Sequence, residues 1–397
     1  MRESEHAVSP EGPRPEHPSK ELSSGRRGEN IASDADVLRD AAAKHGAVNM
    51  NIKEKVCSFD SLYRAMHICK RGVLWKDSVA GFVKNGIVNC AKLEDELLSG
   101  KYKISPYNVF EIHEKKTRVI VSTRIRDRVF QRSLCDNYLT AQISKGFIYD
   151  NCACLPGRGT DFARRRLKRH LQRHFRKHGL SGYVLKIDIH DFFGSTLHSV
   201  AKAAGRKRLD DEWAIERVEE IIDSFSHLSP DRGMGLGSQV TQLVQLAILD
   251  DIDHFIKERL HIKGYVRYMD DFILIHEDKD YLRHCLAVIT KMLEDLGLSI
   301  SEKKTGIQPI SQGIHFLGFS HRLTETGKVI STVLHKKIGK ERRKLRKLVS
   351  LVKAGRIARE KADKCLESHL AHIKKGSCRD LVIVTKAYYK GLYKKAS

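Results

Sequence analysis

Two adjacent aspartates, Asp270 and Asp271, stand between strongly apolar runs in the stretch GYVRYMDDFILIHED, residues 264–278. Carboxylates side by side repel each other, and placing them among Ile, Leu and Phe costs free energy unless a positive charge compensates. A second apolar stretch, YVLKIDIHDFF (residues 183–193), carries a further acid, Asp188. Two apolar strands that each present an acid at one level indicate a shared cation site. Carboxylate oxygens suit a hard divalent cation such as Mg²⁺.

Simpler interpretations of these acids are a solvated Asp-Asp turn and a lone buried Asp that satisfies nearby backbone groups. The apolar flanks on both stretches argue against them. Two divalent ions about 4 Å apart can activate a 3′-hydroxyl and stabilise a leaving pyrophosphate. The pattern therefore predicts a two-metal centre held by Asp188, Asp270 and Asp271, and nucleotidyl transfer as its chemistry.

The elements around these acids mix helices and strands without a regular βαβ repeat, which favours an α+β architecture over a doubly wound sheet. Apolar-polar alternation predicts hairpins over residues 107–124 and 264–278 and a buried strand from residue 183. Apolar residues at helical spacing predict helices, the first of them with Ser58 as its cap. These helices are expected over residues 58–72, 77–100, 125–143, 160–178, 210–225, 239–260 and, with a short strand at the end, 278–300.

With these residues in place, the sequence from about 58 to 376 resembles a bacterial reverse transcriptase of the group II intron, retron and diversity-generating superfamily. YMDD in an apolar hairpin, preceded by KIDIHDFF, is the strongest part of this resemblance. The other segments occur in the family's order: KKTRVIVSTRIRDRVFQRSL, GLGSQVTQLVQLAILDDID, LGLSISEKKTGIQPISQGIHFLGF and SHLAHIKKG. The last segment, with RGVLWKDSVAGF ahead of KISPYNVFEI, is most similar to unclassified enzymes associated with antiphage defence.

The resemblance implies a right-hand polymerase that extends a primer on an RNA template. Its substrates would be deoxynucleoside triphosphates, and its cofactor two Mg²⁺ ions with Mn²⁺ as a substitute. Its partners would be template, primer and RNA–DNA duplex, with a dedicated non-coding RNA or partner protein as a further option. The implied parts are a disordered extension (1–49), fingers (50–180), palm (181–320) and a helical thumb (321–397).

The resemblance also assigns roles to single residues. Asp188, Asp270 and Asp271 match the catalytic metal ligands, and the backbone carbonyl of Ile189 adds a ligand. Phe193 matches the steric gate that crowds a ribose 2′-hydroxyl, with ordinary core packing as the alternative for one of Phe192 and Phe193. The remaining matches contact the nucleotide (Arg118, Lys116, Asp191 and Lys304) or form the primer grip (Phe316, Leu317, Gly318 and Phe319).

One segment departs from the family pattern of Gln-Gly, three residues, then Ser-Pro. Leu236 occupies the position of the family's Gln, a residue that contacts the nucleotide and the primer-template. Gln242 occupies the position of the family's Pro. Diversity-generating enzymes, which are error-prone, also have an apolar residue and a Gln at these two places. Altered fidelity and simple packing of Leu236 against the sugar are both open.

The charge balance fits a polyanionic partner. The chain carries 72 Lys and Arg against 49 Asp and Glu, a net charge of +23 over 397 residues. Residues 321–397 hold 22 Lys and Arg against 6 acids, a net charge of +16. Such a surface suits the backbone of an RNA–DNA or RNA duplex and predicts salt-dependent affinity.

Residues 1–49 contain half of the eight prolines and little periodicity, which predicts disorder. Nine cysteines at irregular spacing, and no secretory signal or apolar run of about 18 residues, favour a cytoplasmic (bacterial) protein without membrane contact. His170, His174 and His178 recur every four residues near Cys152 and Cys154. Their spacing is no standard zinc motif, so phosphate contact or a solvated face is favoured over a zinc site.

Other functions remain open. One is a protein-primed or untemplated DNA polymerase of the same fold, and another is an RNA-binding scaffold that has lost catalysis. Three intact acids argue against the scaffold, because without metal they would destabilise the protein around them. A nucleic-acid packaging protein would explain the charge but not the acids.

Overall fold

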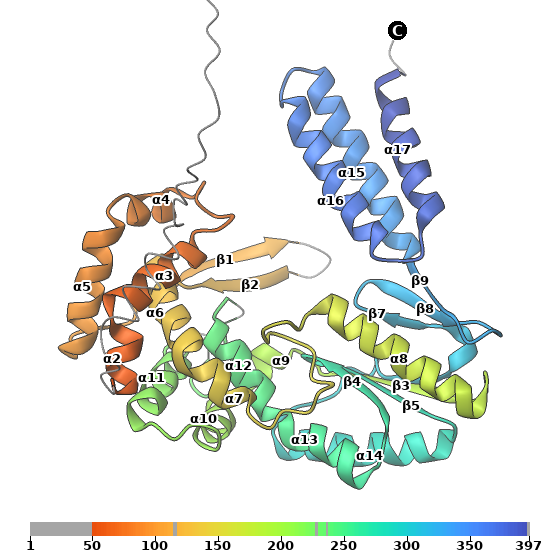
Figure 1. The fold of residues 1–397 in the computed structure, drawn as a ribbon, viewed down its shortest axis with the longest axis horizontal. Helices are drawn as coiled ribbons and strands as arrows, with labels where there is room; N and C mark the ends of the chain where they lie inside the picture. Colours follow the sequence, from red (N-terminus) through yellow and green to blue (C-terminus); the bar gives the residue numbers. More distant parts are fainter. Residues whose placement is uncertain (1–49, 114–116, 227–228, 236, 395–397) are drawn as a thin grey trace, which may run out of the picture. The chain divides into compact units, whose positions relative to one another are not determined.

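The computed structural model describes residues 50–113, 117–226, 229–235 and 237–394. The chain divides into two units, residues 1–49 and 50–397. The disordered extension predicted for residues 1–49 lies outside the described residues, and the account below concerns the second unit. Its helices and antiparallel sheets form the α+β architecture that the sequence predicts (Figure 1).

The N-terminal part of this unit is helical and carries one hairpin. Ser58 caps its second helix as predicted, since its side chain accepts a hydrogen bond from the N–H of Ser61 at 3.4 Å. The hairpin pairs β1 (Asn108–His113) with β2 (Thr117–Ser122) in the predicted place. The helices are α2 (Ile52–Cys57), α3 (Phe59–Cys69), α4 (Asp77–Lys84), α5 (Gly86–Leu98), α6 (Ile125–Leu134) and α7 (Thr140–Ser144), with a π-helical turn (Cys135–Leu139) before α7.

The helix expected over residues 77–100 is two helices that break at Asn85. Gly86 lies against the side chain of Met66, and a Cβ at this position would come within 2.8 Å of the Met66 sulfur. The backbone of α5 therefore packs directly on α3, a close approach that the spacing of apolar residues does not reveal.

A four-stranded sheet carries the acids singled out above. Its strand order is β4-β5-β3-β6, and all neighbouring strands are antiparallel. Helix α8 (Thr160–His178) contacts β4 and β5, and α14 (Lys279–Asp295) contacts β3, β5 and β6 (Figure 1). The two helices cover opposite faces, which explains the nearly continuous apolar runs in the strands. The strands are β3 (Tyr183–Asp188), β4 (Gly264–Tyr268), β5 (Asp271–His276) and β6 (Gly306–Pro309).

Helices between β3 and β4 connect this sheet to the N-terminal part. The single helix expected over residues 239–260 ends at Ile248, restarts at Asp250 after a bend at Leu249, and closes in a π-helical turn, Phe255–Arg259. The bend allows buried Asp250 to pair with Arg208. The helices are α9 (Phe192–Ser195), α10 (His198–Arg206), α11 (Glu212–Asp223), α12 (Gln239–Ile248) and α13 (Asp250–His254).

The C-terminal region is a small sheet followed by three helices. The sheet has the order β7-β8-β9, with β7 (Ile314–Phe316), β8 (Phe319–Leu323) and β9 (Val329–Val333). The predicted start of the helical region, residue 321, therefore falls inside β8, and strands precede its first helix. Residues 319–323 and 329–333 have the alternating burial of strands, and the first helix begins only at His335.

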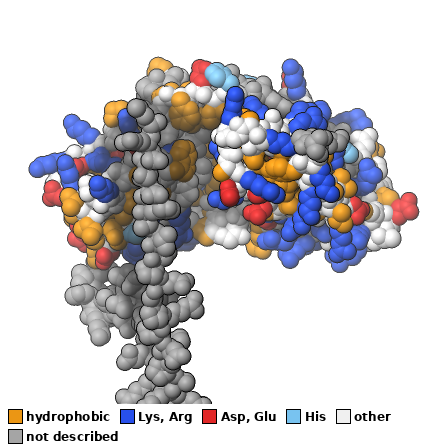
Figure 2. All heavy atoms as spheres, turned by 90° about the horizontal axis from the view of Figure 1, so that it is seen from above, with side chains coloured by type: hydrophobic (Ala, Val, Ile, Leu, Met, Phe, Trp, Pro, Cys, Tyr) orange, Lys and Arg blue, Asp and Glu red, His pale blue; other side chains and the backbone are white. Residues whose placement is uncertain are grey.

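Helices α15 (His335–Lys353), α16 (Arg359–Lys374) and α17 (Arg379–Lys394) form what we call the C-terminal helical module. They pack on a small core that includes Leu345, Val349 and Tyr389. The face of the molecule that Figure 2 shows carries many Lys and Arg side chains among hydrophobic and other side chains. Among the described residues, no helix is both long and apolar enough to cross a membrane.

Candidate active site

The three predicted acids meet at one edge of the four-stranded sheet. Asp188 is the last residue of β3, Asp271 is the first residue of β5, and the two are register partners. Asp270 precedes Asp271 in the turn that joins β4 to β5. Directly opposed residues of an antiparallel pair point to the same face of a sheet. The carboxyl groups of Asp188 and Asp271 therefore share one face.

The turn itself is tight. Tyr268 and Asp271 are register partners, so Met269 and Asp270 are the two turn residues. Met269 has a φ of 54°, the left-handed conformation that the first central residue of a two-residue hairpin turn adopts. A residue with a Cβ pays roughly 1–2 kcal/mol for this conformation. The cost is tolerated here in a turn that fixes the position of Asp270.

Two lysines compensate part of the negative charge. The Nζ of Lys304 lies 2.6 Å from Oδ1 of Asp188, and the Nζ of Lys186 lies 2.9 Å from Oδ1 of Asp271. Lys186 is two residues before Asp188 on β3, so both side chains point to the same face. The backbone N–H of Asp188 donates to Oγ1 of Thr305 at 3.3 Å. Asp188 is 5% exposed.

Asp270 is the acid whose environment resists ionisation. Burial raises the pKa of its carboxyl group, and the charges of Asp271 and Asp188 raise it further. A hydrogen bond from its own backbone and the charge of Lys304 act in the opposite direction. A cluster of this kind stores repulsion that a bound cation would relieve.

A buried ion pair contacts the backbone of the turn between β4 and β5. Arg267 and Asp253 are both fully buried, with 2.7 Å between Nε of Arg267 and Oδ1 of Asp253. Nη1 of Arg267 donates to the carbonyl oxygen of Met269 at 3.1 Å, and Nη2 donates to that of Leu246 at 3.3 Å. The guanidinium group thus fixes the backbone one residue before Asp270.

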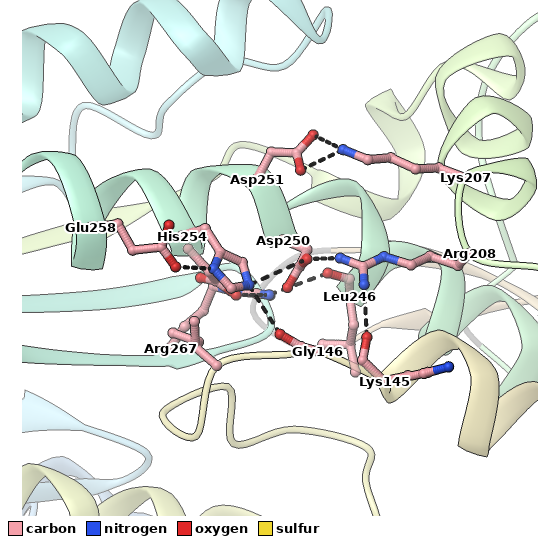
Figure 3. Close-up of polar contacts among 12 residues, drawn as sticks. Lys145, Gly146, Lys207, Arg208, Leu246, Asp250, Asp251, His254, Glu258 and Arg267 are labelled. Atoms are coloured by element: carbon pink, nitrogen blue, oxygen red, sulfur yellow. Dashed lines mark hydrogen bonds and ion pairs between the residues drawn. The ribbon is translucent and has the colours of Figure 1, made fainter.

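A second polar network joins α13 to neighbouring elements (Figure 3). The carboxylate of Asp250, 1% exposed, pairs with Arg208, whose Nη1 donates to the carbonyl oxygen of Lys145 at 2.8 Å. His254 follows on the same helix, with 2.6 Å between its Nδ1 and Oε1 of Glu258. That hydrogen bond to Glu258 raises the pKa of His254. The network fixes α13, which carries Asp253.

A family model described as reverse transcriptase (RNA-dependent DNA polymerase) matches residues 108–321, which include all three acids and the sheet that carries them. The chain belongs to this family. Its domain is that of an RNA-directed DNA polymerase, a nucleotidyltransferase.

Among solved structures, three telomerases are similar to this reverse transcriptase. A Candida albicans telomerase in complex with a TWJ fragment of telomeric RNA has 11% identity and a TM-score of 0.46, over 75% of this chain and 58% of that one. A C-terminally truncated apo telomerase from Candida tropicalis has 15% identity and a TM-score of 0.45, over 58% and 56%. The apo telomerase from Candida tropicalis has 13% identity and a TM-score of 0.42, over 55% and 46%.

The matched region thus spans at most 58% of these telomerase chains. A search of curated proteins gave no match.

The segment after β3 carries three further predicted residues, and the first of them contacts Asp270. The backbone N–H of Ile189 lies 3.4 Å from the carbonyl oxygen of Asp270. Asp191 is exposed, has a φ of 41° and precedes α9. Phe192 is 3% exposed and belongs to the core, whereas Phe193 is half-buried, with 5.9 Å between the ring centroids. Of the two rings, Phe193 is therefore the more exposed.

Several residues predicted to contact the nucleotide are described in part or not at all. Lys116 and Leu236 lie outside the described residues. Arg118 is in β2, opposite Ile112, but its side chain is not among those described. Gln242 is half-buried on the first turns of α12. Gly237, just before α12, approaches β2 so closely that a Cβ would lie 3.3 Å from the carbonyl oxygen of Val121.

The predicted primer grip is a hairpin turn between β7 and β8. Phe316 and Phe319 are buried and register partners, and Leu317 and Gly318 form the turn, with φ of 45° and 88°. A Cβ on Gly318 would collide with the side chain of Lys337 in α15. Both phenylalanines are therefore core, and the two turn residues are partly exposed.

Three residues of the site were not predicted from the sequence: Lys186, Arg267 and Asp253. The signal for Lys186 was its position two residues before Asp188 on a predicted strand, which puts both on one face. Arg267 lies in the middle of an apolar strand, a position that predicts a buried charge with an acidic partner. No local pattern identified Asp253 as that partner.

Proposed function

We propose that this chain extends a primer on an RNA template with deoxynucleoside triphosphates, and that Asp188, Asp270 and Asp271 are its catalytic residues. The observation that carries the proposal is the convergence of these three acids, on two paired strands and their connecting turn, inside the reverse transcriptase region.

The donor set fits a divalent cation of the Mg²⁺ class. Three carboxylates offer hard oxygen ligands, and the raised pKa of Asp270, caused by burial and neighbouring acids, is what a site built for a cation would have without it. Asp188, Asp270, Asp271 and the carbonyl oxygen of Ile189 are the groups that would hold Mg²⁺ or Mn²⁺. When bound, the metal would supply Lewis acidity toward the primer hydroxyl and the triphosphate.

The residues around the acids would bind and position the nucleotide. Phe193 would crowd a ribose 2′-hydroxyl, and the N–H of Asp191 would meet the triphosphate. Lys304 pairs with Asp188 in the absence of substrate and would turn toward the pyrophosphate, since its side chain is 56% exposed. Arg118, Lys116, Leu236 and Gln242 would complete the nucleotide pocket, with a forked guanidinium suited to the triphosphate.

Template and primer would lie between the predicted fingers, palm and thumb. The basic C-terminal helical module supports this placement, because its charge can replace condensed counterions along a duplex. The turn at Leu317 and Gly318 would contact the primer strand. A dedicated non-coding RNA or partner protein would bind this same basic surface.

We also propose a role in bacterial antiphage defence or a related retroelement system. The support is the likeness of the segments RGVLWKDSVAGF and SHLAHIKKG to that group of enzymes. Expression in a phage-sensitive host should lower plaque formation, and D270N should remove the protection. Equal plaque numbers with and without the wild-type gene, across a phage panel, would contradict this role.

The activity is tested by primer extension on a defined RNA template with deoxynucleoside triphosphates and Mg²⁺. D188N, D270N and D271N should each lower the extension rate by at least about 10³-fold, since each removes a charge needed in the transition state. D280N is the matched control, because Asp280 is exposed on α14. Wild-type extension without an RNA template would favour untemplated or protein-primed synthesis. RNA binding without extension would favour the scaffold.

A further inference from the structure

A cluster of histidines and one glutamate lies at the far end of the sheet from Asp270. His174 and His178 are in the last turns of α8, and Glu277 directly follows β5. One ligand atom from each of these three side chains lies within 4.8 Å of the other two. They line a cavity of about 340 Å³. We propose that His174, His178 and Glu277 bind a transition metal ion of the zinc class.

The spacing of the polar atoms argues for a shared ion rather than direct hydrogen bonds. Nε2 of His178 lies 3.6 Å from Oε2 of Glu277, beyond ordinary hydrogen-bond length. Two ligand atoms about 2.0–2.1 Å from one tetrahedral zinc ion lie roughly 3.3–3.4 Å apart. The observed separation is close to this value, so small side-chain rotations bring both atoms onto one ion.

The tautomer of His174 also leaves one ring nitrogen free to bind a metal ion. Its Nε2 lies 2.6 Å from the carbonyl oxygen of Ser181, and a carbonyl can only accept, so this nitrogen carries the hydrogen. The lone pair is then on Nδ1. Metal-binding histidines commonly donate their other N–H to a backbone carbonyl in this way. Burial lowers the pKa of His174, which keeps the ring neutral and able to ligate.

His276 lies beside Glu277 but is not one of the three residues whose ligand atoms converge. Its Nδ1 lies 3.1 Å from the backbone nitrogen of Asp278 and 3.4 Å from the carbonyl oxygen of that residue. Its Nε2 lies 3.7 Å from Oε2 of Glu277. The protein ligands are therefore two histidines and one carboxylate, a set that zinc accepts with a fourth position left open.

The surrounding charge selects the kind of metal. Arg173, Lys177 and Lys263 line the same cavity and oppose any cation. A hard ion such as Mg²⁺, which binds imidazole weakly, would not overcome them, whereas Zn²⁺ binds imidazole strongly. The same cations favour hydroxide or another anion at the open position. Cys152 and His170, which lie near these residues in the sequence, are not part of the group of converging ligand atoms, and Nε2 of His170 lies 2.9 Å from Oδ1 of Asp150.

The ion would connect two distant parts of the chain. It would fasten the end of α8 to the end of β5, the strand whose other end begins with Asp271. Zinc binding should therefore raise the melting temperature, because it stabilises only the folded chain. This inference does not depend on the proposed polymerase activity.

The test is zinc binding by the whole chain after removal of metals with a chelator. Excess Mg²⁺ occupies the oxygen sites during calorimetric titration with ZnCl₂, and bound metal is counted by mass spectrometry. We expect one zinc per chain, at least 10-fold weaker binding in H178Q and E277Q, and unchanged binding in the exposed controls H315Q and E325Q. D270N should bind zinc like the wild type while losing extension.

Cobalt(II) distinguishes this site from the nine free cysteines. The proposal expects a tetrahedral cobalt spectrum without a thiolate charge-transfer band. His178 and Glu277 are partly exposed, so both variants should fold, which circular dichroism checks. Zinc affinity that is equal in wild type, H178Q and E277Q, or a wild-type chain that binds no zinc, would overturn the proposal.

Discussion

Asp188 faces Asp271 directly across the antiparallel pair of β3 and β5, and Asp270 precedes Asp271 in the turn. Lys304 and Lys186 each form an ion pair with one of the two opposed acids. Asp270 has the raised pKa, caused first by burial and then by the charges of its neighbours. Repulsion among the three acids lowers the stability of the metal-free protein. The proposed metal site can therefore be tested through the melting temperature.

Replacing Asp270 with Asn should stabilise the metal-free protein at neutral pH. An acid whose pKa is higher in the folded state binds more protons when folded, so stability falls as the pH rises from the ordinary Asp value through the folded pKa. D270N removes the ionisable group and therefore this loss of stability at high pH. Its melting temperature at pH 7 should exceed that of the wild type by a few degrees, with about 2–4 °C per kcal/mol in domains of roughly 150–250 residues.

The same difference in melting temperature should vanish below about pH 3, where folded and unfolded Asp270 are both protonated. D280N, at an exposed position, should change the melting temperature little at either pH. A D270N protein that melts below the wild type at pH 7 in chelator would contradict this account of the site.

Variants of the ion pair between Arg267 and Asp253 should distinguish its effect on stability from its effect on the position of Asp270. R267M leaves the carboxylate of Asp253 buried with the hydroxyl of Tyr265 but without its cationic partner, and breaking a buried ion pair costs about 3–5 kcal/mol. The double variant R267M/D253L should recover much of that loss in a denaturant titration. Extension should stay low in the double variant, because the carbonyl oxygen of Met269 has lost its donor. Full recovery of extension would mean that Arg267 contributes to stability alone.

Phe193 should control the choice of sugar. F193A opens space beside the acids, and a steric contact of this kind is worth roughly 10–200-fold in discrimination. The ratio of kcat/KM for deoxyribonucleotides over ribonucleotides should fall by at least about 10-fold. F192L, which alters the buried neighbouring ring, should affect stability more than this ratio. An unchanged ratio in F193A would place the gate elsewhere.

Lysines on α15 should account for part of the salt dependence of duplex binding. Lys336, Lys340, Arg343 and Lys347 are exposed and recur at helical spacing along one side of this helix. K340Q should reduce the slope of log affinity against log salt by about 0.7–0.9 if this side chain neutralises one phosphate. K92Q, on α5, is the control. Equal slopes in wild type and K340Q would remove Lys340 from the interface.

The sequence predicts the elements that carry the site well, because each is encoded by a local pattern. Alternation of apolar and polar residues located both hairpins, and helical spacing located α8 over residues 160–178. Apolar flanks were sufficient to single out the three acids that the sheet brings together. These signals need no knowledge of distant contacts.

The features that the sequence did not predict depend on tertiary contacts. The break at Leu249 accompanies the ion pair of Asp250 and Arg208, and the break at Asn85 accompanies the packing of Gly86 on Met66. Neither partner can be identified from spacing along the chain. Lys304 was singled out by the family resemblance, but its ion pair with Asp188 was not predicted, because the two residues lie 116 positions apart in the sequence.

The most direct test of the central claim is the sequence of the DNA that the purified protein makes. A defined RNA template with an annealed primer is supplied with deoxynucleoside triphosphates and Mg²⁺, and the products of the wild type, D188N and D270N are sequenced. We predict DNA complementary to the template from the wild type and no extension from either variant. DNA unrelated to the template, or the same product from D270N, would contradict templated synthesis at Asp188, Asp270 and Asp271.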